Sequence, residues 1–125
     1  MKTITISTGS ISASASSTSS AIDLAELVGD NSRAIRPDGF FSLQYTITGD
    51  GTAKIEYLLS NDETTWVEPD AATDIATGLV KTSGAGGDGK GFVSWTQDVS
   101  KSMKIKVTET GTSSTVTAVL VLAVQ

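Results

Sequence analysis

The sequence contains neither cysteine nor histidine, and it is poor in proline, aromatic residues and charge. Without cysteine, the chain can form neither disulfide bonds nor thiolate metal sites. Without histidine, it lacks the side chain that most often serves as general base, metal ligand and pH switch near neutrality. Charged residues make up 18% of the chain, below the usual value of about 25%. These absences point away from hydrolytic and metal-dependent catalysis.

The charge that is present is mostly negative. Fourteen acidic residues against nine basic ones give a net charge of −5. Binding to nucleic acid through counterion release needs a basic surface, so we expect no nucleic-acid partner. We also expect no membrane partner, because no segment approaches the roughly 20 apolar residues that cross a bilayer. The first residues lack the apolar run of about 7–15 residues found in secretion signals, so we expect synthesis in a cytoplasm without a cleaved leader.

Strand periodicity is the clearest positive signal, and it is strongest over residues 40–66. Apolar and polar side chains alternate over residues 41–48 and again over residues 53–59, with Leu58 as the one apolar exception, as in half-buried strands. Gly49, Asp50 and Gly51 interrupt the alternation with residues suited to a tight turn. The sequence therefore predicts two strands paired as a β-hairpin.

Similar patterns predict further strands over residues 2–8, 74–79, 91–98, 102–110 and 114–124. Together they predict an all-β domain, an antiparallel β-sandwich of jelly-roll-like type, in residues 21–125. Within it, residues 21–28 fit either a strand or a short helix capped by Ser20. The predicted core comprises Phe41, Leu43, Tyr45, Ile55, Tyr57, Met103, Ile105, Val107 and Leu120.

Residues 1–20 form a separate segment in this interpretation. Residues 10–20 are nearly all serine and alanine, and such a composition buries too little apolar area to offset its ordering entropy. We expect an extended N-terminal arm that is flexible in an isolated monomer or ordered against another subunit.

The last strand provides candidate interface residues. From Ala118 onward it is apolar on both faces, and such a strand must be covered by its own fold or by a partner. We therefore predict an interface through Val119 and Val121 in this strand, and through Ile4 and Ile6 in the arm.

No grouping of residues suggests catalysis, a cofactor or a metal. The oxygen ligands nearest to a calcium set are Asp50, Asn61, Asp62, Glu63 and Glu68. These residues lie in predicted turns, where short polar side chains bond the backbone, and they lack EF-hand spacing. The glycine-rich residues 83–91 lack the spacing of a phosphate-binding loop, and a mobile hairpin loop is the simpler interpretation. We therefore predict no catalytic, cofactor or metal site.

Four aromatic residues remain as a possible sugar-stacking platform. They are Tyr45, Tyr57, Trp66 and Trp95. At these positions in strands, aromatic side chains more often fill a core or an interface, and we favour that interpretation.

The chain contains an ordered series of short motifs: FSLQY at 41–45, GDGTAKIEY at 49–57, SNDETTW at 60–66, TSG at 82–84, DGK at 88–90, MKIKVTETG at 103–111 and AVQ at 123–125. This series resembles small β-sandwich virion proteins of tailed bacteriophages. The SNDxTxW element is similar to a turn of discoidin-like jelly rolls. Glu63 stands where this pattern usually has glycine, which predicts a less demanding backbone conformation at that turn.

The resemblance implies a non-enzymatic structural role in a virion. A capsid decoration (cement) protein is the preferred expectation, with other virion proteins, the major capsid protein above all, and further copies of itself as partners. The alternatives are a tail, neck or head-fibre component, or a carbohydrate-binding module on a phage appendage that would use Trp66 or Trp95.

Overall fold

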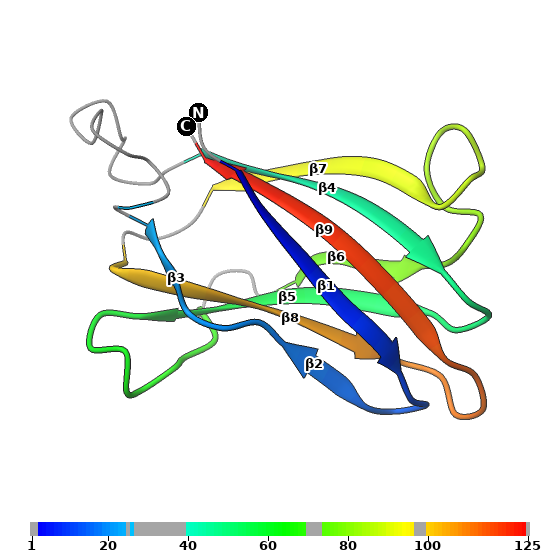
Figure 1. The fold of residues 1–125 in the computed structure, drawn as a ribbon, viewed down its shortest axis with the longest axis horizontal. Helices are drawn as coiled ribbons and strands as arrows, with labels where there is room; N and C mark the ends of the chain where they lie inside the picture. Colours follow the sequence, from blue (N-terminus) through cyan, green and yellow to red (C-terminus); the bar gives the residue numbers. More distant parts are fainter. Residues whose placement is uncertain (1–2, 25, 27–39, 70–73, 97–99, 125) are drawn as a thin grey trace.

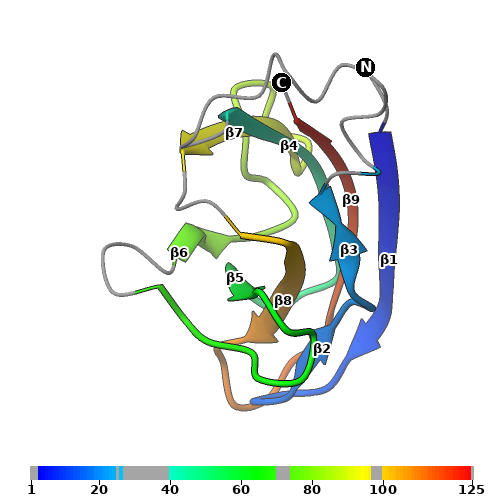
Figure 2. The ribbon, with the colours of Figure 1, turned by 90° about the vertical axis from the view of Figure 1, so that its left-hand side faces the viewer.

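The computed structural model describes residues 3–24, 26, 40–69, 74–96 and 100–124. These residues form two antiparallel β-sheets that pack against each other (Figures 1 and 2). The strands are β1 (Thr3–Ile11), β2 (Ser16–Thr18), β3 (Ile22–Asp23), β4 (Phe40–Thr48), β5 (Ala53–Ser60), β6 (Asp74–Leu79), β7 (Lys90–Thr96), β8 (Ser102–Glu109) and β9 (Val116–Val124). The predicted all-β antiparallel sandwich is therefore confirmed.

The order of the strands defines the topology. The first sheet has the order β1-β9-β4-β7 and the second the order β2-β8-β5-β6, with the short β3 also paired to β8. The pairs are nested along the chain: β1 pairs with β9, β2 and β3 with β8, β4 with β7, and β5 with β6. If β2 and β3 count as one interrupted strand, this is the eight-strand pattern of a jelly roll.

The predicted hairpin over residues 40–66 is wrong in its pairing, although both of its strands exist. β4 pairs with β7 and β9 in the first sheet, whereas β5 pairs with β6 and β8 in the second. The turn at Gly49–Gly51 therefore carries the chain from one sheet to the other. Both glycines lie tightly against the Thr115 backbone, because a Cβ at Gly49 would come within 2.7 Å of the Thr115 carbonyl oxygen. Alternation defined the strands here but not their partners.

Residues 3–20 belong to the sandwich, so the expectation of an N-terminal arm outside the domain is corrected. β1 runs alongside β9 at an edge of the first sheet (Figure 1), with pairs from Thr3↔Ala123 to Ile11↔Val116. The chain then turns over to the second sheet, where β2 pairs with β8. Ile11 and Ile22 are buried in the common core.

The serine-rich stretch is held by hydrogen bonds to β8 more than by apolar burial. Ser19 N–H donates to Ile105 O at 2.8 Å, and Ser19 Oγ accepts from Ile105 N–H at 3.0 Å. Farther along β8, Glu109 N–H donates to Ala15 O at 2.9 Å. The composition argument counted apolar area only, whereas pairing with an existing strand edge satisfies the backbone of a polar segment.

The core lies between the sheets and contains every residue predicted for it. Leu43, Ile55, Met103 and Leu120 are fully buried, and the other predicted members are nearly so. Of the ambiguous residues 21–28, Ile22 and Asp23 form a strand and Leu24 and Glu26 are helical, while 25, 27 and 28 lie outside the described residues.

Candidate interaction surface

The outer face of the first sheet is built from alternate residues of four strands. Leu120 and Leu122 of β9 are fully buried, so their neighbours Val119, Val121 and Ala123 point to the opposite, outer face. The register places these three residues in rows with outward residues of the neighbouring strands. The rows are Ser7–Val119–Thr46–Lys90, Thr5–Val121–Gln44–Phe92 and Thr3–Ala123–Ser42–Ser94.

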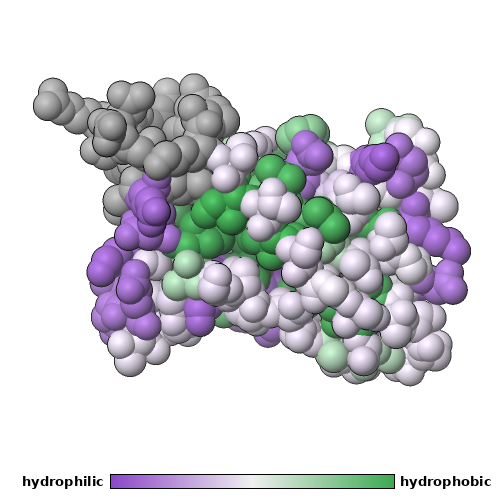
Figure 3. All heavy atoms as spheres, in the orientation of Figure 1, coloured by the Kyte–Doolittle hydropathy of each residue, from purple (hydrophilic) through white to green (hydrophobic). Residues whose placement is uncertain are grey.

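This outer face is almost uncharged, and two of its apolar side chains are exposed. Lys90 is the one charged residue in the three rows, and the rest are hydroxyl, amide or apolar side chains. Val119 is 37% exposed and Phe92 is 71% exposed, while Val121 and Ala123 are half-buried. Figure 3 shows apolar surface gathered in the middle of the side of the molecule that bears β1 and β9.

The four predicted interface residues do not share one surface. Val119 and Val121 lie on the outer face, as an interface requires. Ile4 and Ile6 pair with Leu122 and Leu120 and pack, half-buried, against the core. The assignment of Ile4 and Ile6 to an interface is therefore corrected: in a paired edge strand, their side of the alternation faces the inside of the sandwich.

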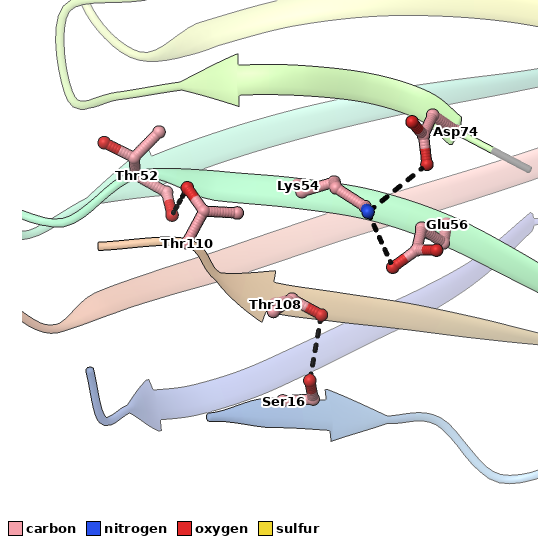
Figure 4. Close-up of polar contacts among 7 residues, drawn as sticks. All are labelled: Ser16, Thr52, Lys54, Glu56, Asp74, Thr108 and Thr110. Atoms are coloured by element: carbon pink, nitrogen blue, oxygen red, sulfur yellow. Dashed lines mark hydrogen bonds and ion pairs between the residues drawn. The ribbon is translucent and has the colours of Figure 1, made fainter. Parts of the chain in front are cut away.

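The outer face of the second sheet has the opposite character, because charged residues alternate along its central strands. Lys54 Nζ lies 3.6 Å from Glu56 Oε1 and 3.7 Å from Asp74 Oδ1 (Figure 4). Glu56 also stands opposite Lys106 in the register between β5 and β8. Lys54 and Asp74 are partly exposed, so their ion pair stabilises the fold by at most about 1 kcal/mol, whereas Glu56 is buried. The main consequence of these charged residues is that this face stays hydrated and charged, unlike the outer face of the first sheet.

The SNDETTW turn leads out of β5 and is organised by Asp62. Its Oδ1 accepts hydrogen bonds from Thr65 N–H at 2.8 Å, Thr64 N–H at 2.9 Å and Ser60 Oγ at 3.0 Å. These bonds, from the backbone of Thr65 and Thr64 first and from Ser60 next, lower the pKa of Asp62 to about 2. Asp62 is thus a turn-forming residue whose ionised form the fold favours.

Glu63 adopts a left-handed backbone conformation with φ of 58°. The expectation that this departure from glycine implies a less demanding conformation is therefore wrong. Its side chain offsets part of the strain, since Oε1 accepts a hydrogen bond from Ser102 Oγ at 2.6 Å. Ser102 is fully buried, so Glu63 satisfies a hydroxyl group that has left water.

Of the five side chains considered for calcium, Asp50, Asn61, Asp62 and Glu63 accept hydrogen bonds from other residues of the chain. Asn61 Oδ1 accepts from Lys101 N–H at 2.9 Å, and Asp50, in another loop, pairs with Lys81 Nζ at 2.6 Å. The hydrogen bond and the charge of Lys81 lower the pKa of Asp50. Within the described ranges, no three acidic residues cluster as metal ligands. In the same part of the chain, no helix is long and apolar enough to span a membrane.

The aromatic residues mostly fill the interior. Trp95 stacks on Phe41 with ring centroids 5.4 Å apart and lies 6.0 Å from Tyr57, and Tyr45 and Tyr57 are buried. Trp66 is half-buried, and Lys104 Nζ lies 4.4 Å from the centroid of its ring. Trp95 faces the core, which favours the preferred interpretation of these aromatic residues as core filler.

The glycine-rich loop between β6 and β7 closes on itself. Gly89 N–H donates to Ser83 O at 2.8 Å, and Gly89 O accepts from Ile47 N–H at 2.9 Å. A Cβ at Gly89, whose φ is 79°, would lie 2.5 Å from Ile47 O. Gly89 thus serves close backbone packing, which favours a structural role over phosphate binding. The expectation of a hairpin loop is wrong, because β6 lies in the second sheet and β7 in the first, so the loop crosses between the sheets.

Glu109 is a buried acid at the end of β8. It is 1% exposed. Its Oε2 accepts from Thr52 N–H at 2.6 Å and its Oε1 from Gly111 N–H at 2.5 Å. The carboxylate thereby links the β4–β5 turn to the β8–β9 turn at one end of the sandwich. The sequence did contain a sign of this burial, because Glu109 continues the inward-facing set of β8 after Ile105 and Val107.

Comparisons with known proteins give no family. No protein-family model and no curated protein matches the chain. Among solved structures, the chain is similar to one in "Structure of infectious bursal disease virus Gx strain", with a TM-score of 0.43 and 11% sequence identity. The match covers 97% of this chain and 31% of that chain, so this chain spans about a third of the length of the other.

Proposed function

We propose that this protein is a non-enzymatic structural protein of a tailed-bacteriophage virion, and that it decorates the capsid shell. The observation that carries the proposal is the almost uncharged outer face of the first sheet, with Val119 and Val121 near its centre. A protein that binds a shell non-covalently needs a face with a small desolvation free energy. Burying an unpaired charge makes that free energy large and unfavourable. The phage motif series in the sequence gives the class of virion.

The contrast between the two outer faces gives the proposed binding an orientation. The face around Val119 would lie against the shell, where neighbouring hydroxyl groups such as those of Thr5 and Thr46 supply a polar rim. The face around Lys54 and Glu56 would remain in solvent. Repetition over many equivalent sites would let modest individual contacts stabilise a whole shell.

The proposed partners are the major capsid protein and further copies of this chain, and the proposed location is the virion. The same face would also serve a tail, neck or head-fibre protein. Of these roles we favour decoration, because a small sandwich with one neutral face suits a flat, repetitive surface. Glycan binding is less favoured, since Trp95 packs inside on Phe41.

The test is co-sedimentation of the purified protein with tailless shells of the phage that encodes it. A Val119→Asp, Val121→Asp double variant should fold, as judged by circular dichroism, and should bind shells at least about tenfold more weakly. Val67→Asp is the matched control, because Val67 is 55% exposed and pairs with Leu59 of the second sheet.

Normal shell binding by the folded double variant would refute the role of this face. If the double variant does not fold, the single Val119→Lys change replaces it. Wild-type protein that binds isolated tails but not shells would refute decoration in favour of a tail role.

A further inference from the structure

The sandwich has four sheet edges, and three of them carry features that oppose pairing with another strand. β1 has a register shift between Ser7 and Ser10, where Gly9 has φ of 66°. β6 has two register shifts against β5. β2 and β3 have three and two residues. Bulges and short strands are the usual means by which proteins block edge-to-edge association.

The fourth edge, β7, carries none of these features. Its seven residues pair with β4 without a register shift, from Thr46↔Lys90 to Phe40↔Thr96. It contains no proline, its single charge is Lys90 at the first position, and Phe92 on it is 71% exposed. Among the described residues no strand pairs with its outer edge.

The hydrogen-bond phase shows which backbone groups of β7 point away from β4. Ile47 N–H donates to Gly89 O just beyond the end of the ladder. In an antiparallel pair the bonded residues alternate, so residues 91, 93 and 95 bond to β4. The N–H and C=O groups of Phe92, Ser94 and Thr96 therefore point outward from the sheet.

We propose that β7 pairs antiparallel with β7 of a second copy of this chain, so that the first sheets of two copies join into one continuous sheet. This arrangement has two-fold symmetry, and an antiparallel edge is complementary to itself under such an axis. It rests on strand geometry and specifies how the further copies named among the proposed partners would bind, while binding to the capsid shell does not depend on it.

The sequence of β7 supports pairing with itself. If the two strands overlap fully, with the axis at Val93, Phe92 stands opposite Ser94 of the second copy, and Lys90 stands opposite Thr96. No like charges face each other across the axis. The two Phe92 rings become diagonal neighbours on the outer face, a distance that aromatic side chains can bridge.

Two variants test the edge while leaving the pairing with β4 intact. Ser94→Pro removes an outward N–H, and proline is tolerated on an edge strand at such a position. Phe92→Lys replaces the exposed ring by a charge, as protected natural edges do. Val67→Lys is the matched control, since it removes the exposed apolar side chain Val67 from the second sheet.

Sedimentation velocity should show a concentration-dependent dimer for wild type and Val67→Lys, and monomers for both edge variants, with unchanged circular dichroism. Hydrogen exchange should show the amides of Phe92, Ser94 and Thr96 protected in the dimer and unprotected in the Phe92→Lys monomer. If Ser94→Pro does not fold, sedimentation velocity of Phe92→Lys alone tests whether the dimer forms through β7.

Three outcomes would overturn the proposal. They are a wild-type protein that stays monomeric up to about 1 mM, a dimer that persists in folded edge variants, and dimer amides at these positions that exchange freely. A monomer whose edge variants lose only shell binding would assign the edge to a capsid strand in place of a second copy. Shell binding that survives in the edge variants leaves the proposed function standing whatever the dimer result.

Discussion

Replacing Glu63 by glycine sets two opposing effects against each other at the turn after β5. The left-handed backbone of Glu63, with φ of 58°, is strained for a residue that has a Cβ. Its carboxylate, however, accepts a hydrogen bond from the buried Ser102 hydroxyl at 2.6 Å. Glycine relieves the strain but removes the acceptor.

The two effects have comparable magnitudes. Relief of left-handed strain is worth about 1–2 kcal/mol, less about 0.4–1 kcal/mol for the greater freedom of glycine in the unfolded chain. Loss of the bond to Ser102 leaves a buried hydroxyl unpaired, which costs about 1–3 kcal/mol. Glu63→Gly should therefore destabilise the wild-type protein by about 1 kcal/mol.

The sign of the effect should reverse when Ser102 is alanine. In a Ser102→Ala background the hydroxyl is absent, so Glu63→Gly removes only strain and should stabilise the protein by about 0.5–1 kcal/mol. Urea unfolding of the four proteins of this cycle, followed by tryptophan fluorescence, measures both changes. The reasoning fails if Glu63→Gly has the same sign and size in both backgrounds.

Three further predictions concern stability. Leu43→Ala, at a fully buried position, should lower the unfolding free energy by about 2–5 kcal/mol in urea; a loss below 1 kcal/mol would contradict its place in the core. Glu109→Ala should cost about 2–4 kcal/mol, because it leaves two backbone N–H donors unpaired, whereas exposed Glu68→Ala should be nearly neutral. The pKa of Asp62 is lowered in the folded state to about 2 from 3.8. Its stabilisation is therefore complete above the unfolded value and lost as the pH falls toward 2. Asp62→Asn should flatten this part of the stability curve, and an unchanged curve would refute the assignment.

Most strand positions and faces could be predicted from the sequence, although β2 in the serine-rich stretch could not, and neither could the strand partners. Alternation of side chains is a local property, so it assigned Leu43 and Ile105 to the inside of the sandwich. Pairing depends on contacts between distant residues. The Gly49–Gly51 turn illustrates the limit, because glycine residues permit both a tight hairpin and the crossover between sheets that the fold adopts.

Side-chain alternation also predicted which residues of β9 lie on the outer face, but not what contacts them. The double apolar character of β9 identified Val119 and Val121 as residues on its second face, and they do lie there. Ile4 and Ile6 were assigned to an interface for a different reason, because residues 1–20 were expected to form a separate arm; once β1 pairs with β9, these two side chains face the core. The conformation of Glu63 was misread, because the glycine usual at this position of the pattern is itself a sign of a left-handed backbone, which Glu63 adopts under strain.

Phe92 connects the two proposed surfaces. It stands in the same row of the outer face as Gln44 and Val121, while its backbone groups lie on the free edge of β7. As a central strand, β9 has its backbone bonded on both sides, so Val119 adds little aggregation risk; the exposed edge of β7 is where that risk remains. A dimer through β7 would satisfy this edge and would set two neutral faces side by side in one continuous sheet. A shell with local two-fold symmetry would then meet a matched pair of faces, with affinity raised by their linkage.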